Sequence, residues 1–139
     1  MMVVTLVDTG PLVAMCNRRD AHHAWTLASL SSVTGALTTC EPVLTEACFL
    51  LKQAFGAADE LFEMIERGLL RIEFSVAAEY KRVQQLMNRY ADLPTSLADA
   101  CLVRMAELHP SSRIMTLDHD FNVYRKHGRQ AIPLLAPYA

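Results

Sequence analysis

Four acidic residues lie where a solvated surface carboxylate is not expected, and they are Asp8, Glu46, Asp99 and Asp118. Carboxylates brought together in a fold repel one another, so one becomes protonated unless a cation lies between them. An all-oxygen ligand set suits hard ions such as Mg²⁺ or Mn²⁺. Two such ions about 3.5–4 Å apart can activate water and stabilise a leaving oxygen. Taken together, the four acids predict a metal site for phosphoryl chemistry.

Glu46 is the most informative of the four. On a helix its neighbours three and four positions away are Pro42, Val43, Phe49 and Leu50. An unpaired carboxylate is costly in such apolar surroundings. We therefore expect Glu46 to have a cation or a hydrogen-bond partner, and a buried salt bridge to an arginine is the alternative.

The three aspartates also have purely structural explanations, which stay open here. Asp8 follows an apolar run and precedes Gly10 and Pro11, where it could form a turn or cap a helix. Asp99 lies three residues after Ser96, the spacing of a capping box. Asp118 could cap a following helix. Asp92 is a weaker fifth candidate that reads as a loop acid.

Other kinds of site are poorly supported. The sequence has no P-loop, no G-x-G-x-x-G and no G-x-S-x-G motif. Its net charge of −2 is unlike that of a passive nucleic-acid binder, although bound metal ions can supply positive charge. No C-x-x-C pair occurs, and small buried thiols are expected at Cys16, Cys40, Cys48 and Cys101.

The elements that must position the acids alternate between strands and helices. Strands are predicted at 2–7, 35–39, 69–74, 113–116 and 131–135. Helices are predicted at 20–30, 41–55, 57–67, 75–90, 96–108 and 118–126. This alternation favours an α/β fold with a mostly parallel sheet. Ligands of such folds lie beyond the carboxyl ends of the strands, where Asp8 and Asp118 are expected.

The 139 residues fit a single domain over positions 1–139. No run reaches the ~20 apolar residues of a membrane span, and the start lacks the basic region of a signal peptide. We therefore expect a cytoplasmic protein without a membrane segment.

Four segments resemble those of PIN-domain nucleases, particularly the VapC-type toxins of VapBC toxin–antitoxin pairs. They follow one another in the order expected for that family and are V-D-T-G-P-L at 7–12, L-T-E-A at 44–47, L-A-D-A at 97–100 and T-L-D-H-D-F at 116–121. The resemblance implies a three-layer α/β/α sandwich and an acidic site of Asp8, Glu46, Asp99 and Asp118. It also implies Mg²⁺- or Mn²⁺-dependent cleavage of RNA, a homodimer and an antitoxin partner.

Supporting roles are expected near this site. Thr9 and Thr116 match positions whose hydroxyls support the acids in the family, and Asp120 follows Asp118 closely. His119 lies between two acids and could assist them. Candidate cations for the approach of RNA are Arg18, Arg19, Lys52, Arg104, Arg125 and Lys126, each of which could equally be a solvated surface charge.

The expected mechanism is hydrolysis by metal-activated water, without a protein nucleophile. Asp8, Asp99 and Asp118 are expected as direct ligands, and Glu46 binds metal or orients water. Two alternatives remain: a non-catalytic PIN-like module that binds RNA or protein, and a phosphotransfer domain with Asp8 as the covalent acceptor. The second lacks the D-x-D-x-T pattern, because Gly10 occupies the second acidic position.

Overall fold

A parallel sheet forms the centre of the computed structural model, which describes residues 2–138. Five strands lie in the order β3-β2-β1-β4-β7, and every pairing between them is parallel. Their bounds are Val4–Val7 (β1), Leu37–Thr39 (β2), Leu70–Ile72 (β3), Ser112–Met115 (β4) and Leu134–Leu135 (β7). Central strand β1 is almost wholly buried, as its apolar sequence predicts.

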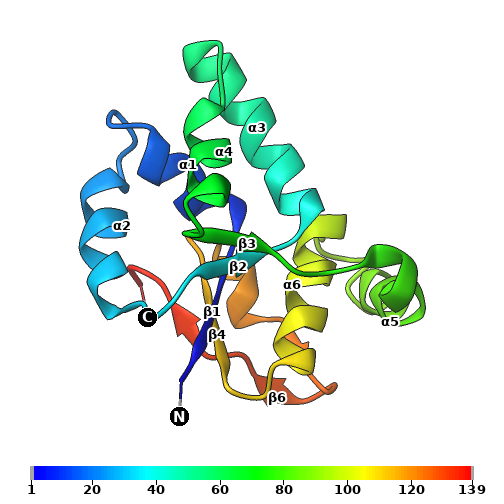
Figure 1. Ribbon diagram of the computed structural model, residues 1–139. Coiled ribbons are helices and arrows are strands. Elements are labelled where there is room, and N and C mark those ends of the chain that lie inside the picture. Colours follow the sequence, from blue (N-terminus) through cyan, green and yellow to red (C-terminus); the bar gives the residue numbers. More distant parts are fainter. Residues whose placement is uncertain (1, 139) are drawn as a thin grey trace.

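Helices cover both faces of this sheet (Figure 1). Helices α1 (Thr9–Cys16) and α2 (His23–Ser29) lie on one side, while α5 (Val76–Arg89) and α6 (Leu97–Leu108) pack together on the other. The long helix α3 (Glu41–Phe55) contacts both α1 and α6, and α4 (Asp59–Glu66) contacts β3. The three-layer α/β/α arrangement expected from the sequence is therefore confirmed.

Helix α3 has the bounds that its sequence predicts. Gly56 ends it with φ of 77°, a left-handed conformation that glycine adopts without steric cost. Only a narrow face of this helix is buried, however. Val43, Ala47 and Leu51 are buried, whereas Leu50 is 42% exposed. Apolar residues outside this stripe therefore face solvent.

The C-terminal region differs from the sequence prediction. A helix was expected over 118–126, but only a 3₁₀ turn, η2 (His119–Asn122), forms, followed by strand β5 (Arg125–Lys126). The strand expected over 131–135 is divided at Pro133, because proline cannot donate a backbone hydrogen bond. Gln130–Ala131 (β6) pairs antiparallel with β5, and only β7 joins the main sheet. A second 3₁₀ turn, η1 (Leu30–Ser32), follows α2.

Across residues 2–138, no helix is long and apolar enough to cross a membrane.

Candidate metal centre

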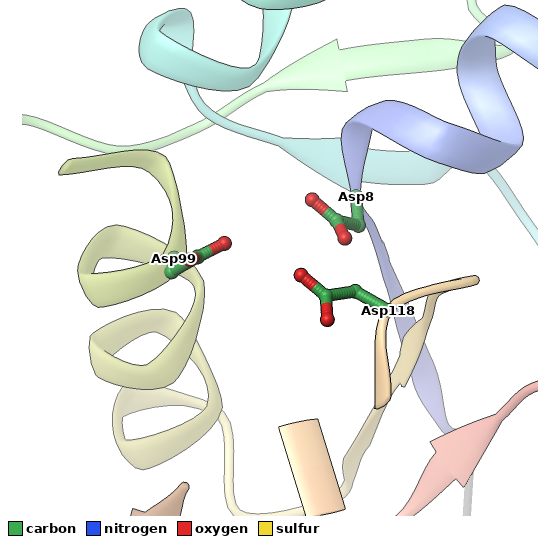
Figure 2. Close-up of side chains that lie close together, drawn as sticks. All are labelled: Asp8, Asp99 and Asp118. Carbon is green, nitrogen blue, oxygen red and sulfur yellow. The ribbon is translucent and has the colours of Figure 1, made fainter. Parts of the chain in front are cut away.

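Three aspartates from distant parts of the chain converge at one edge of the sheet. Asp8 directly follows β1, Asp99 lies in the first turn of α6, and Asp118 lies in the loop after β4. One carboxylate oxygen from each lies within 4.8 Å of the other two. Figure 2 shows the three side chains pointing toward one another from three separate elements. The convergence follows from the parallel pairing of β1 with β4, which places their carboxyl ends side by side.

Asp8 is held rigidly and lies almost out of contact with water. Its Oδ1 accepts a hydrogen bond from the Thr9 amide at 2.8 Å, and its Oδ2 accepts one from the Thr116 hydroxyl at 2.8 Å. Burial disfavours the charged form and raises the pKa of Asp8 to about 7, and the neighbouring charges of Asp99 and Asp118 add to that effect. A positive charge close to Asp8 would therefore favour its ionised form at neutral pH.

Asp99 has a structural role and also faces the site. Its Oδ2 accepts from the Ser96 amide at 3.1 Å, and the Ser96 hydroxyl accepts from the Asp99 amide, which completes a capping box. The Tyr124 hydroxyl also donates to Oδ2, at 3.2 Å. Burial raises the pKa of Asp99, and so do the charges of Asp118 and Glu46, while these hydrogen bonds oppose the shift. The capping box therefore forms as its spacing predicts, and the same carboxylate also faces Asp8 and Asp118, while its role as a metal ligand stays a prediction.

Asp118 is positioned by the turn that begins there. Its Oδ1 accepts from the Asp120 amide at 2.9 Å, so it caps η2. The Thr116 hydroxyl accepts from the Asp118 amide at 2.9 Å while it donates to Asp8, and it thereby joins two of the three acids. The Tyr138 hydroxyl donates to the Asp118 carbonyl at 2.6 Å.

Glu46 lies beside this cluster, but its surroundings differ from those expected. Glu46 is exposed, and its apolar neighbours Phe49 and Leu50 face solvent as well. The carboxylate is therefore not buried, and the alternative of a buried salt bridge does not apply. Its Oε2 accepts from the Thr9 hydroxyl at 3.0 Å. Glu46 is not among the three acids whose oxygens lie within 4.8 Å of one another. It lines the same cleft as they do.

The cleft around the acids has a cavity volume of about 400 Å³. Its lining residues are Asp8, Thr9, Gly10, Glu46, Pro94, Ser96, Asp99, Leu117 and Asp118. Gly10 allows α1 to approach the following loop closely, because a Cβ there would lie 3.1 Å from the Leu117 side chain. No lysine, arginine or histidine is among the residues that line the cleft.

The donor set of this site fits a divalent cation. Within residues 2–138, the ion pairs that form involve none of Asp8, Asp99 and Asp118. Carboxylates at this spacing, without a protein cation, are the hard oxygen ligands that Mg²⁺ and Mn²⁺ favour. The raised pKa of Asp8 indicates the same need for positive charge.

Several other predicted residues lie elsewhere or act indirectly. The Asp120 amide donates to Asp118, but the Asp120 carboxylate is not part of the three-acid cluster. His119 is exposed and stacks on Tyr138, with ring centroids 4.0 Å apart. Asp92 is an exposed loop residue outside the lining of the cleft, as its loop interpretation predicts.

Two of the expected RNA-binding cations are engaged within the protein, and a third is buried. Arg104 forms ion pairs with Glu79 and Glu107 on the α5–α6 side. The Arg125 guanidinium donates to backbone carbonyls near η2, and Lys126 is buried. Arg18, Arg19 and Lys52 are exposed.

Sequence reasoning missed Tyr124 and Tyr138, which bind Asp99 and the Asp118 backbone respectively. It also missed Thr39, whose hydroxyl donates to the Val7 carbonyl at 2.7 Å, next to Asp8. Spacing along the chain carries no signal for such contacts, because each joins segments that are distant in sequence.

Comparison with known proteins identifies the family of this chain. The family model of the PIN domain matches residues 5–127, which is most of the chain. The chain belongs to the PIN domain family. This PIN domain is 27% identical over 126 residues to Ribonuclease VapC26 of Mycobacterium tuberculosis, covering 88% of this chain and 93% of the relative.

A solved structure gives the same result for the fold. The crystal structure of Mycobacterium tuberculosis VapC20, described as a toxin that cleaves the sarcin–ricin loop, superimposes on this PIN domain with a TM-score of 0.75. It is 22% identical and covers 86% of this chain and 93% of its own. At this level of sequence identity, the similarity shows only that the two proteins share a fold.

Proposed function

We propose that this PIN domain is a metal-dependent endoribonuclease that hydrolyses phosphodiester bonds in RNA, and that it is the toxin of a toxin–antitoxin pair. The convergence of Asp8, Asp99 and Asp118 within 4.8 Å, without a protein cation among them, carries the proposal. The similarity over nearly the full length to a relative named a ribonuclease supports the substrate class.

Asp8, Asp99 and Asp118 would hold Mg²⁺ or Mn²⁺. When bound, such an ion supplies Lewis-acid stabilisation of the negative charge that develops on the phosphate. Thr116 and Tyr124 hold two of these acids in place through the hydrogen bonds already described. Because these hydrogen bonds already hold the two side chains in place, binding of an ion would cost little side-chain conformational entropy.

In this proposal, Glu46 acts on the attacking water. The Thr9 hydroxyl fixes its Oε2, and Oε1 has no hydrogen-bond partner within residues 2–138. We assign Oε1 to orienting the water and accepting its proton. The water oxygen then bonds to phosphorus as a phosphorus–oxygen ester bond breaks, and the leaving oxygen takes up a proton from solvent to depart as an alcohol. No protein nucleophile is required.

The test is cleavage of a panel of single-stranded and structured RNAs with Mg²⁺ or Mn²⁺, beside an EDTA control. We expect metal-dependent cleavage by the wild type and a loss of at least about 100-fold in Asp99→Asn, since an essential charge is removed. Glu66→Gln, an exposed acid at the end of α4, is the matched control and should cleave normally.

Two results would count against this function. Normal cleavage by Asp99→Asn would remove that acid from the mechanism. A folded wild type that cleaves no RNA on the panel with either metal would favour the non-catalytic binding module.

An antitoxin partner and a homodimer belong to the same proposal. The similarity to VapC proteins supports the antitoxin, and the homodimer and the cytoplasmic location stay predictions. The single PIN domain over 1–139 is likewise proposed, and the family match over 5–127 supports it.

A further inference from the structure

An exposed aromatic side chain lies one helical turn from the acidic cleft. Phe49 follows Glu46 by three residues on α3, and residues at that spacing are neighbours on a helix surface. The Phe49 side chain is 62% exposed, whereas the core-facing side of α3 carries Val43, Ala47 and Leu51. Phe49 therefore contributes little to the core of this domain.

Apolar groups also form part of the cleft itself. Pro94 and Leu117 line it beside the acids, and Leu97, two residues before Asp99, is 40% exposed. The lining of the cleft thus combines carboxylates with the apolar groups of Pro94 and Leu117. Because lysine and arginine are absent from its lining, its own side chains cannot attract the substrate through phosphate charge.

Resting on the proposed ribonuclease function, we propose that Phe49 is a stacking platform for an unpaired base of single-stranded RNA next to the cleaved phosphate. Every base presents a flat π face, so an exposed aromatic ring can bind it without reading its sequence. A base within a duplex is already stacked and paired. The arrangement therefore favours single-stranded substrates.

Two other exposed phenylalanines serve as controls. Phe55 is 52% exposed at the far end of α3, and Phe62 is 55% exposed on α4. Phe55 lines a separate cavity with Ala54 and Ala58, and neither phenylalanine lines the acidic cleft. Phe62 matches Phe49 closely in type and exposure, and it lies on a different helix.

The first experiment measures RNA binding with single-stranded oligonucleotides that contain 2-aminopurine, whose fluorescence falls when it stacks on an aromatic ring. The Asp99→Asn background with Mg²⁺ prevents cleavage during the titration. Phe49→Leu should abolish the quenching and weaken binding by about fivefold to a hundredfold. Phe49→Tyr should retain both, since the ring is kept, and Phe62→Leu should match the parent.

The second experiment measures cleavage kinetics in the full-length protein with Asp99 intact. Phe49→Leu should raise KM for single-stranded RNA by a similar factor, with kcat nearly unchanged, because Phe49 does not touch the reacting atoms. The difference between single-stranded and duplex RNA should narrow in the same variant. Thermal unfolding checks that each variant is folded.

The outcomes separate this inference from the proposed function. If the wild type cleaves RNA and Phe49→Leu binds and cleaves equally well, the stacking role is wrong and the nuclease function stands. If Phe49→Leu changes only the solution mass of the protein, Phe49 belongs to a protein interface and the inference is overturned. A folded wild type that neither binds nor cleaves RNA overturns both.

Discussion

At the residue scale, Asp8 is the most strongly constrained group of the site. The Thr9 amide and the Thr116 hydroxyl each donate a hydrogen bond to one of its oxygens, and its side chain is largely buried. The two hydrogen bonds favour the charged form, but burial outweighs them and brings the pKa to about 7. Asp8 is therefore a group whose ionisation opposes folding unless a cation is present.

The variant Asp8→Asn tests, in metal-free buffer, whether ionisation of Asp8 destabilises the fold. The folded-state pKa lies above the unfolded value of 3.8, so the wild type loses stability as pH rises from about 4 to 7, and the penalty is complete above 7. Asp8→Asn removes the charge and should be more stable by roughly 2–4 kcal/mol at pH 8. The gain should vanish near pH 4, as measured by urea unfolding at both values. An Asn variant less stable than the wild type at pH 8 would contradict the assignment.

At the scale of elements, the starts of three helical segments meet at the site. Asp8 caps α1, Asp99 is the third residue of α6, and Asp118 caps η2. Helix N-termini carry partial positive charge and free amides, which stabilise nearby carboxylates. The same side chains that begin these segments therefore form the candidate ligand set, with part of their repulsion already offset.

At the opposite end of α6, a cluster of charged residues connects this helix to neighbouring segments. Glu107 is buried and accepts two hydrogen bonds from the Arg82 guanidinium, at 2.9 and 2.6 Å. Its Oε2 also accepts from the His127 amide at 2.7 Å, which ties the β5–β6 hairpin to this helix. Burial alone would raise the pKa of Glu107, but these partners outweigh it and lower the pKa to about 2.

Acid unfolding of Glu107→Gln tests this cluster. A lowered folded-state pKa means that the stabilisation is present above the ordinary value of 4.5 and is lost as pH falls toward 2. At pH 7 the variant should lose about 1.5–3 kcal/mol, the usual effect of charged hydrogen bonds. Between pH 4.5 and 2 its stability should fall less than that of the wild type.

The matched control is Glu73→Gln, which removes an exposed ion pair with Arg71 on β3. Solvent screens such a pair, so the change should cost less than about 1 kcal/mol. Equal losses in the two variants at pH 7 would show that the Glu107 cluster does not stabilise the α6 contact.

At the scale of the whole molecule, the candidate site joins segments that are distant along the chain. Strand β1 pairs with β4 across more than 100 residues, and α6 packs against both strands. Asp8 and Asp118 follow these two strands and Asp99 lies in α6, so a bound cation would connect the three segments directly. Such binding favours the folded state over the unfolded one.

Mn²⁺ should therefore raise the thermal stability of the protein. At a free concentration about 100 times Kd, the stabilisation is about 2.7 kcal/mol, which corresponds to a Tm increase of roughly 5–10 °C at this size. Because the pKa of Asp8 is about 7, protons compete with metal below neutrality, and the increase should be larger at pH 8 than at pH 6. Differential scanning fluorimetry measures both effects.

For that measurement, Asp99→Asn is the test variant and Glu66→Gln is the control. The first should lose most of the Tm increase, and the second should retain it. An increase of equal size in Asp99→Asn would place the metal outside the three-acid cluster.

Local sequence pattern accounts for much of this protein. The run 2–7, the helix from Glu41 to Phe55 and the Ser96–Asp99 capping spacing each predict their local structure, because hydrophobic periodicity and capping act over a few residues. The position of Asp8 after a buried strand likewise predicts that it lies at the carboxyl edge of the sheet. The order of the four acids along the chain was sufficient to suggest the family.

Tertiary structure alone decided which of these groups meet. The pairing of β1 with β4 brings Asp8 and Asp118 together, and the packing of α6 adds Asp99, whereas Glu46 lies exposed at the side of the cluster. The hydrogen bond from Tyr124 to Asp99 and the raised pKa of Asp8 also depend on long-range packing. Burial and contacts between distant segments arise only when the chain closes, so spacing along the sequence cannot encode them locally.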